Sequence, residues 1–304
     1  MAMRECSLHF DFMNEQKQLD LDKARELFGI AQKLGIHTYN TYGNPAVYPD
    51  PADDEKDHQF AREIRQLADQ FQMSCSSFHF IGSVLDVDQP DQQRIRHVMQ
   101  RSLQINSQLG THVFVAHPGT FSDGGFKQNK VVHRQALQQW GAEKTHQIIV
   151  ENLRWFGQQA AHYGIRLAIE NIYGGRFYSQ IDELIQLVEE VDLDNVGWCL
   201  DVGHANVDGV DLVQTVHRMK EKLFELHLHD NNGQKDQHLP AGFGTVDWIA
   251  FIQALNDIQY PGPATFEFFR WPLADREKGI TRAVELWRTM EWVAENGYWT
   301  LDWF

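Results

Sequence analysis

The chain has 304 residues, and its 42 acidic against 27 basic side chains give a formal net charge of −15. Hydrophobic residues make up 42% and charged residues 23% of the sequence, a composition that excludes intrinsic disorder, collagen and coiled coil as descriptions of the whole chain. The negative charge opposes long-range attraction to phosphate backbones, so we do not expect nucleic acid as a partner.

The cysteine usage and the N-terminal sequence bear on the compartment. Cys6, Cys75 and Cys199 are widely spaced and form no CxxC pair, which is typical of a reducing compartment and not of a disulfide framework. The first residues contain no basic segment followed by an apolar run, so no signal peptide is expected. No stretch approaches the roughly 20 apolar residues of a membrane helix. The sequence therefore predicts a soluble, cytoplasmic protein.

Short strand-like runs alternate with longer segments of helical period. The predicted strands cover residues 5–10, 36–42, 73–80, 112–117, 165–170, 196–201, 223–230 and 264–269. Helical periodicity is clearest over 20–35, 92–110, 131–164 and 179–191. The first three of these helices end in glycine, which accepts the left-handed conformation that follows a helix. Ser179, four residues before Glu183, gives the fourth a loose capping signal. Loops are predicted over 44–57 and 119–130.

Eight alternations of strand and helix favour a parallel sheet with helical crossovers, and eight is the number that closes a (β/α)8 barrel. An open, doubly wound sheet is disfavoured because His9, Phe10 and Asp11 stand where a GxGxxG fingerprint would follow the first strand. No linker divides the chain. We therefore predict an α/β fold with a single (β/α)8 TIM-barrel domain over residues 1–304. The aromatic C-terminal sequence GYWTLDWF is expected to pack over the barrel bottom, with a homo-oligomer contact as the alternative.

Ionisable residues end or follow the last six predicted strands. In a barrel, the loops leaving the carboxyl ends of the strands converge over one mouth. Buried there without partners, such residues would be costly, and a shared cation would relieve that cost. Carboxylates and imidazoles without a thiolate suit Mn²⁺, Mg²⁺, Co²⁺ or Zn²⁺. The residues are His79, His117, Glu170, Asp201, His204, His227, His229, Asp236, His238 and Glu267.

Each of these residues also has a simpler explanation. A single strand-end histidine can be structural, Asp201 can cap the following helix, and Glu170 can pair with a lysine or arginine. The other histidines in the chain, His9 among them, are interpreted as surface or core residues. It is the joint occurrence on consecutive strands that favours a functional site.

At these residues the sequence resembles the xylose isomerase-like TIM-barrel superfamily, which includes sugar and sugar-phosphate isomerases and epimerases and the endonuclease IV family. The resemblance covers the second half of the chain well and the first half loosely. Its motifs are HPG at 117–119, AIEN at 168–171, CLDVGHAN at 199–206, HLHDNNGQKDQHLPAGFGTVDW at 227–248 and TFEFF at 265–269.

The resemblance to the isomerases and epimerases implies one divalent metal ion held by Glu170, Asp201, His227 and Glu267. It also implies that the two glutamates act as acid and base on a carbon beside a carbonyl or hydroxyl. The expected substrate-binding residues are His204, His238, His117, His79, Asp236 and Arg270. Arg176 is a second candidate for binding a phosphate or carboxylate. Phe12, Trp248, Phe269 and Trp271 are candidates for stacking on a sugar, although core packing is favoured for Trp248.

The leading hypothesis is a divalent-metal-dependent isomerase or epimerase of a sugar, sugar phosphate or polyol. A dehydratase acting on an inosose or dehydroshikimate would use the same proton abstraction. The resemblance to endonuclease IV implies a trinuclear zinc site in an AP endonuclease, and its nine matching positions are all present. Asn231 and Asn232 stand where some ketose 3-epimerases have an arginine, which argues against that activity. The nine positions are His79, His117, Glu170, Asp201, His204, His227, Asp236, His238 and Glu267.

Overall fold

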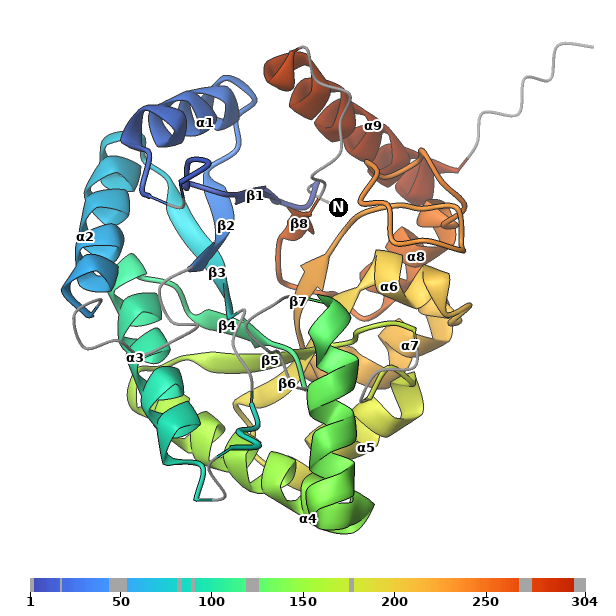
Figure 1. Cartoon of the computed structure of the whole chain (residues 1–304). Coiled ribbons are helices and arrows are strands. Elements are labelled where there is room, and N and C mark those ends of the chain that lie inside the picture. The colour runs from blue at the N-terminus through green and yellow to red at the C-terminus, as the bar shows by residue number, and fades with distance from the viewer. Residues whose placement is uncertain are drawn as a thin grey trace, which may run out of the picture.

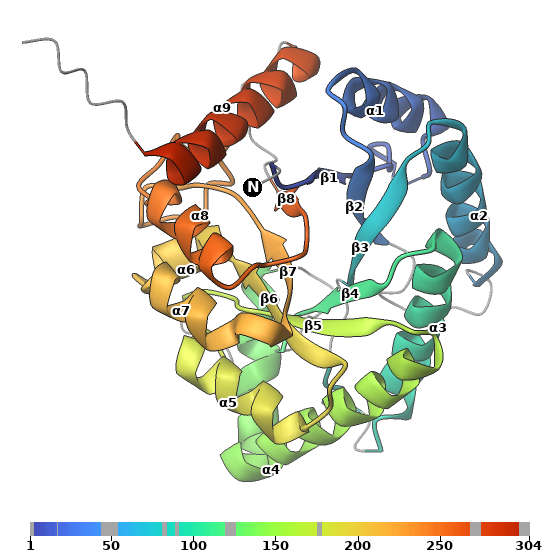
Figure 2. The same ribbon diagram turned by 180° about the vertical axis from the view of Figure 1, so that it is seen from behind.

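The computed structural model describes residues 3–16, 18–43, 54–80, 84–88, 91–118, 126–174, 178–267 and 275–297, with only the backbone described at 43, at 54 and over 126–133. Within these residues, eight parallel strands form a barrel that is surrounded by helices, seen along its axis in Figure 1 and from behind in Figure 2. This confirms the prediction of an α/β (β/α)8 barrel and excludes the open, doubly wound sheet.

The eight strands match the predicted segments, with shorter bounds at several ends. They are β1 Cys6–Phe10, β2 Thr38–Gly43, β3 Ser74–Phe80, β4 Val113–Ala116, β5 Arg166–Glu170, β6 Val196–Asp201, β7 Leu223–His227 and β8 Ala264–Phe266.

Helices follow the strands around the outside of the barrel (Figure 1). They are α1 Leu21–Lys33, α2 Asp54–Gln70, α3 Gln93–Leu109, α4 Phe126–His162, α5 Ile181–Val191, α6 Val202–Val207, α7 Leu212–Met219, the 3-10 turn η3 Lys220–Lys222, α8 Trp248–Asp257 and α9 Arg276–Asn296. Within the described part of the chain, no helix is long and apolar enough to cross a membrane.

The helix boundaries correct three sequence predictions. The first four residues of α2 were assigned to a loop but are helical, and α4 begins five residues before the predicted start at 131. Gly141 then interrupts α4 with φ 79° and ψ 167°, so the segment is two helices with a break. At the start of α5, the N-cap is Gln180 without a side-chain hydrogen bond, so Ser179 does not cap the helix. The glycines predicted to follow helices, Gly35, Gly110 and Gly164, do have positive φ.

The barrel closes between its last two strands over a short stretch. Hydrogen-bonded neighbours run in the order β7-β6-β5-β4-β3-β2-β1-β8, and an isolated parallel bridge between Leu228 and Phe266 joins the two ends. Two backbone hydrogen bonds carry this join, from Leu228 N to Thr265 O at 2.8 Å and from Glu267 N to Leu228 O at 3.1 Å. We call this short join the β7–β8 seam.

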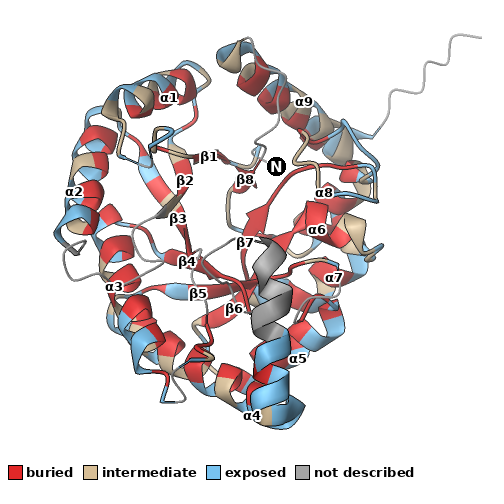
Figure 3. Ribbon diagram, viewed as in Figure 1, coloured by how far each residue is buried: buried red, intermediate tan, exposed pale blue. Residues whose placement is uncertain are grey.

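The strands are buried on both faces, as Figure 3 shows. Their outer faces pack under the helices in the main hydrophobic core. Inside the barrel, an apolar cluster contains Val115, Ala168 and Cys199 with two further residues. Successive side chains alternate between the faces of a strand, so the residues two positions further along, His117, Glu170 and Asp201, also face inward. The apolar cluster therefore forms the layer directly beneath these strand-end residues inside the barrel.

On the other side of the barrel, the layer beneath the strand ends is polar. The hydroxyl of Thr265 donates to Glu225 Oε1 at 2.6 Å, across the β7–β8 seam. Burial raises the pKa of the Glu225 carboxyl, which favours its neutral form. Ser7 and Ser76 form a second, partly buried contact, with their hydroxyl oxygens 2.8 Å apart. Side-chain hydrogen bonds thus contribute to joining β7 and β8, where backbone pairing is short.

Helices α2 and α3 are joined by a buried ion pair between Asp57 and Arg101, whose side chains are each 3% exposed. We expect Asp57→Ala to lower the free energy of unfolding by about 3–5 kcal/mol, because it removes the carboxylate that is paired with a guanidinium buried in the core. The matched control is Glu55→Ala on the same helix, where the pair with Arg62 is exposed and the expected loss is below about 1 kcal/mol. Urea unfolding measures both, and equal losses would contradict the prediction.

Candidate functional site

Ionisable side chains gather at the carboxyl end of the barrel, inside the strands. Four of them come from consecutive strands β5 to β8: Glu170, Asp201, His227 and Glu267. One ligand atom from each of the four lies within 4.8 Å of the other three, and all four residues are buried. We call these four residues the quartet. The structure therefore brings together the residues that the sequence selected as metal ligands.

His227 lies between the two glutamates of the quartet. Its Nδ1 atom is 3.1 Å from Glu170 Oε1 and 3.4 Å from Glu267 Oε2. Burial alone would lower the pKa of His227, but the surrounding acidic groups outweigh it and raise the pKa well above its usual value. Burial raises the pKa of the neighbouring Cys199 thiol, so this residue offers no thiolate.

Two histidines from β3 and the end of β4 contact the same oxygen of Glu170. The Nε2 atoms of His79 and His117 each lie 3.1 Å from Glu170 Oε2. Burial opposes a charge on both rings. In His79 the glutamates outweigh it and raise the pKa to about 9, whereas in His117 burial dominates and the pKa is lowered. The two rings are thus neighbours of the quartet, as expected of pocket residues.

Asp201 combines a structural and a site role. Its Oδ1 atom accepts the backbone N–H of His204 at 2.7 Å, which caps α6. The side chain of Asn171 brackets the backbone of Asp201, accepting from its N–H at 2.8 Å and donating to its carbonyl at 2.9 Å. The helix-capping alternative raised from the sequence is therefore correct, and it does not remove Asp201 from the quartet.

A second group of possible ligands lies beside the quartet and consists of His204, His229, Asp236 and His238. Asp236 is at its centre, 3.1 Å from His238 Nε2 and 3.7 Å from His204 Nε2. The opposite nitrogens of these two rings donate to backbone carbonyls: His204 Nδ1 to Asn171 at 2.9 Å and His238 Nδ1 to Glu267 at 2.8 Å. These hydrogen bonds orient both rings toward Asp236.

Electrostatics in the second group follow from its carboxylates. Burial would lower the pKa values of His204 and His238, but Asp201 and Asp236 outweigh it and raise them to about 10 and about 9. Burial would raise the pKa of Asp236, and the two histidines hold it far below the usual range. The group can therefore hold positive charge, either as protons or as a cation.

The sequence reasoning counts His229 among the strand-end residues without giving it a role, and it leaves His9 outside the site. His9 lies inside the barrel on β1, hydrogen-bonded to Asn40; burial lowers its pKa to about 4, against the opposing influence of Glu267. His229 is fully buried beside Asp201. The signal for His229 was present in the sequence, since it stands two residues after His227 and shares its face of the strand.

Several candidates do not join the site. Phe12 is 1% exposed and packs against Phe10, Phe28 and Tyr39, so the expectation that it stacks on a sugar is wrong. Trp248 is buried and its Nε1 donates to Asp230 at 2.8 Å, which agrees with core packing. Arg176, Phe269, Arg270, Trp271 and the sequence after Gly297 lie outside the described residues.

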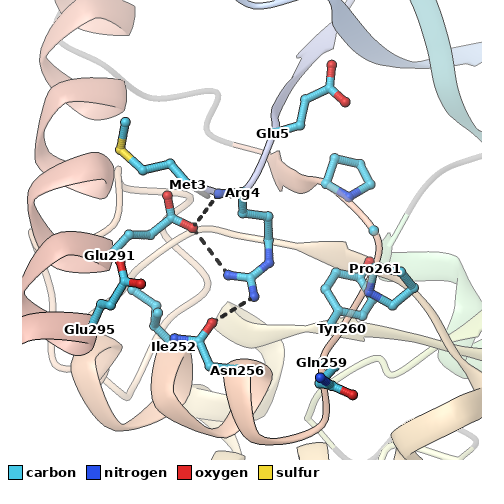
Figure 4. A pocket seen from close by; sticks show the side chains of 12 residues that line it. Met3, Arg4, Glu5, Ile252, Asn256, Gln259, Tyr260, Pro261, Glu291 and Glu295 are labelled. Carbon is cyan, nitrogen blue, oxygen red and sulfur yellow. Dashed lines mark hydrogen bonds and ion pairs between the residues drawn. The ribbon is translucent and has the colours of Figure 1, made fainter. Parts of the chain in front are cut away.

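A cavity of about 280 Å³ opens at the other, amino-terminal end of the barrel (Figure 4). Arg4 lies in its wall and donates to Glu291 Oε1 at 3.2 Å and Asn256 Oδ1 at 3.1 Å. These contacts tie the start of the first strand to α8 and α9. The cavity is lined by none of the strand-end residues, so it is separate from the candidate site.

Comparisons with known proteins agree with this architecture. A family model described as xylose isomerase-like TIM barrel matches residues 28–290. D-psicose 3-epimerase of Enterocloster bolteae is 29% identical over 143 residues, which cover 46% of this chain and 44% of that protein. L-ribulose 3-epimerase of a Methylomonas species is 29% identical over 133 residues, covering 43% and 44%. The chain thus spans less than half the length of these curated relatives.

Solved structures share the fold over nearly the whole chain. A 3-keto-D-glucoside 4-epimerase from E. coli has a TM-score of 0.70 at 17% identity, covering 94% of this chain and 99% of that one. An L-ribulose 3-epimerase has a TM-score of 0.69 at 14% identity, covering 96% of both chains. At these identities the similarity concerns the fold.

The raised pKa values predict how the stability of the metal-depleted protein depends on pH. His79 and His238, at about 9, and His204, at about 10, lie above the unfolded value of about 6.5. Their contribution is complete below pH 6.5 and is lost as the pH rises through the folded values. We expect the free energy of unfolding, measured with urea, to fall between pH 6.5 and 9.5. His238→Gln should reduce the fall, and a flat wild-type profile would refute the prediction.

Proposed function

The chain belongs to the xylose isomerase-like TIM-barrel family, and from that premise we propose that it is a divalent-metal-dependent isomerase or epimerase. Its substrate is a sugar, sugar phosphate or polyol, and the reaction begins with removal of a proton next to a carbonyl. The matches to sugar 3-epimerases support the substrate class.

The observation that carries this proposal is the quartet. Glu170, Asp201 and Glu267 are three buried carboxylates whose ligand atoms lie within 4.8 Å of one another and of His227. Three negative charges this close are mutually unfavourable in a buried site, and one divalent ion offsets them together. In addition, Glu170 Oε2 and both ring nitrogens of His227 are buried, and their close contacts with neighbouring histidines and carboxylates lack the geometry of a hydrogen bond. The donor set fits Mn²⁺, Mg²⁺, Co²⁺ or Zn²⁺.

Glu170, Asp201, His227 and Glu267 would hold the ion. When bound, it would polarise the oxygens of the substrate and stabilise the negative charge that develops on proton removal. Asp201 enters this site with its orientation fixed by the α6 cap, so little side-chain freedom remains to be lost on binding.

Glu170 and Glu267 are the proposed proton carriers. They extend from β5 and from the end of β8, two strands that are not neighbours in the sheet. Burial opposes their charge, but His227, with the other histidines around them, outweighs it and holds the pKa of both glutamates well below the usual value. Both are therefore ionised and can accept a proton at a carboxylate oxygen. A substrate carbon between them can lose its proton to one carboxylate. Inversion of the centre then requires the other glutamate to have taken up a proton from solvent or from a substrate hydroxyl, which it delivers to the opposite face of the carbon.

The remaining pocket residues are assigned to substrate hydroxyls. We propose that His79, His117, His204, His238 and Asp236 bind and orient the substrate beside the quartet, and that Arg270 binds a phosphate or carboxylate where the substrate has one. A dehydratase acting on an inosose or dehydroshikimate would use the same residues for the first step. Product analysis separates it from an isomerase, because only the dehydratase removes a hydroxyl.

The second group of ligands favours one further candidate. His204, His229, Asp236 and His238 could hold another ion, and so could His79, His117 and Glu170. Three zinc ions in these groups would fit a zinc-dependent AP endonuclease. The net charge of −15 opposes binding to nucleic acid, so the isomerase or epimerase remains the leading proposal.

Metal content tests the choice between one ion and three. We expect about one divalent ion per chain in protein purified without chelators, because the quartet is a single site with four protein ligands. Elemental analysis after gel filtration measures the ratio. About three zinc ions per chain would favour the endonuclease, with abasic DNA as the next substrate. Absence of bound metal, even after addition of Mn²⁺, would remove the basis of the proposed function.

Substitution of the two glutamates tests the chemistry. The assay supplies Mn²⁺ and a panel of ketoses, their phosphates and inososes in D₂O, and it detects the products and deuterium at carbon by NMR. We expect Glu170→Gln and Glu267→Gln to lower turnover by at least about 100-fold, because an amide cannot carry the proton. Glu221→Gln, at an exposed glutamate outside the site, is the control. Full activity in Glu170→Gln with metal bound would overturn the assignment.

A further inference from the structure

His229 has a fixed position between the two ligand groups. It lies two residues after His227, so both rings are on the inner face of the same segment. Its Nε2 atom is 3.0 Å from Asp201 Oδ1 and 3.1 Å from Asp201 Oδ2. Because a carboxylate can only accept, Nε2 carries the proton and donates it between the two oxygens.

Packing holds the ring of His229 from two sides. It stacks on the ring of His238, with the centroids 3.9 Å apart and an angle of 20° between the planes. On the other side is Gly203, where an added Cβ would come within 1.9 Å of His229 Cε1. The absence of a side chain at position 203 therefore makes the space that His229 occupies beside Asp201.

The contact with His229 matters for Asp201 because this carboxylate has different imidazole neighbours from the two glutamates of the quartet. Glu170 and Glu267 both contact His227 within the quartet, whereas the imidazoles beside the Asp201 carboxylate are those of His204 and His229. The α6 cap fixes one oxygen of Asp201, and His229 contacts both. The remaining lone pairs of the carboxylate are left for a ligand in the quartet.

We propose that His229 is a positioning residue that holds the carboxylate of Asp201 in the orientation needed to bind the divalent ion. This inference rests on the proposed function, because it takes Asp201 as a ligand. Removal of a residue that is hydrogen-bonded to a metal ligand typically lowers the metal affinity by about 10–100-fold. His229 thus sets the affinity of the quartet without contacting the ion.

The other ring nitrogen of His229 could instead be a ligand of a second metal ion, which is the alternative to a positioning role. Nδ1 is 3.7 Å from Asp236 Oδ1, and both atoms are buried without a hydrogen bond in the described structure. A second ion in the group of His204, His229, Asp236 and His238 would use Nδ1 as a ligand. The experiment therefore counts ions as well as measuring affinity.

The test titrates Mn²⁺ into the chelator-treated, full-length protein by calorimetry, with Co²⁺ absorption as a spectroscopic readout of the site. His229→Leu removes the hydrogen-bond donor, and His229→Asn supplies one on a side chain too short to reach Asp201. We expect each to weaken Mn²⁺ binding by about 10–100-fold. His229→Gln places an amide N–H near the position of Nε2 and should restore affinity to within a few-fold of wild type. Gly203→Ala keeps the histidine but displaces its ring, so it should weaken binding as His229→Leu does.

His217→Leu is the matched control, since His217 is a half-exposed histidine on α7 outside the site, and it should leave metal affinity unchanged. At saturating Mn²⁺, His229→Leu should regain most of its turnover, which a general loss of structure would not allow. The Co²⁺ spectrum of His229→Gln should match that of wild type.

Three outcomes would overturn the proposal. Wild-type affinity in His229→Leu would show that Asp201 needs no such support. Equal weakening in folded His229→Gln and His229→Leu would exclude the hydrogen bond as the cause. Loss of one of two ions, with the tighter ion unaffected, would make His229 a ligand. A wild-type protein that binds no ion at all would instead overturn the proposed function, so the two failures are distinguishable.

Discussion

Burial of three carboxylates at one end of the barrel is the constraint on which the rest of the site depends. Glu170, Asp201 and Glu267 come from different strands and are almost completely removed from water. Burial penalises each charge and their proximity adds repulsion, so positive charge must lie close by. His227 stands within the quartet, and imidazoles from β3, β4 and the loop after β7 surround it. The histidines in and around the quartet and those of the second group thus offset the same negative charge. Protons on these histidines can do so in the absence of metal, and a divalent ion can do so when it is bound.

The barrel was predictable because it depends on a simple repeat, and the strand-end rule places the quartet within a larger set of ionisable candidates. The choice of those four as ligands came from the resemblance to the isomerases and epimerases. Eight alternations define the strands, and the strand-end rule selects the residue that follows each apolar run, as with Glu170 after Ala168 and Ile169. Other features depend on contacts between distant segments. His9 is interpreted from the sequence as a surface or core residue because its own strand gives no sign of Glu267, which follows the adjacent strand β8. Helical periodicity continues through Gly141, so the break in α4 was not visible. The sequence pattern places the N-cap of α5 at Ser179, whereas in the structure it is the next residue, Gln180.

The filling of the barrel differs between its two sides. Val115, Ala168 and Cys199 make an apolar floor beneath β4 to β6, whereas Glu225 and Thr265 form a buried polar contact beneath β7 and β8. The Glu225 carboxyl, whose pKa is raised by burial, is paired there with the Thr265 hydroxyl below the quartet. Its position also compensates for sparse backbone pairing between these two strands. The polar residues inside the barrel therefore serve closure of the sheet as much as the chemistry above it.

The β7–β8 seam has a consequence for the coupling between ligand binding and folding. Its backbone pairing consists of two hydrogen bonds, and His227 and Glu267 stand on opposite sides of it. A cation held by both residues would cross-link β7 and β8, the pair of neighbouring strands that is joined by the short seam. Part of the free energy of ion binding would then be free energy of barrel closure. Depletion of the ion would loosen the barrel locally, at this seam, before it affects the continuous pairing from β1 to β7.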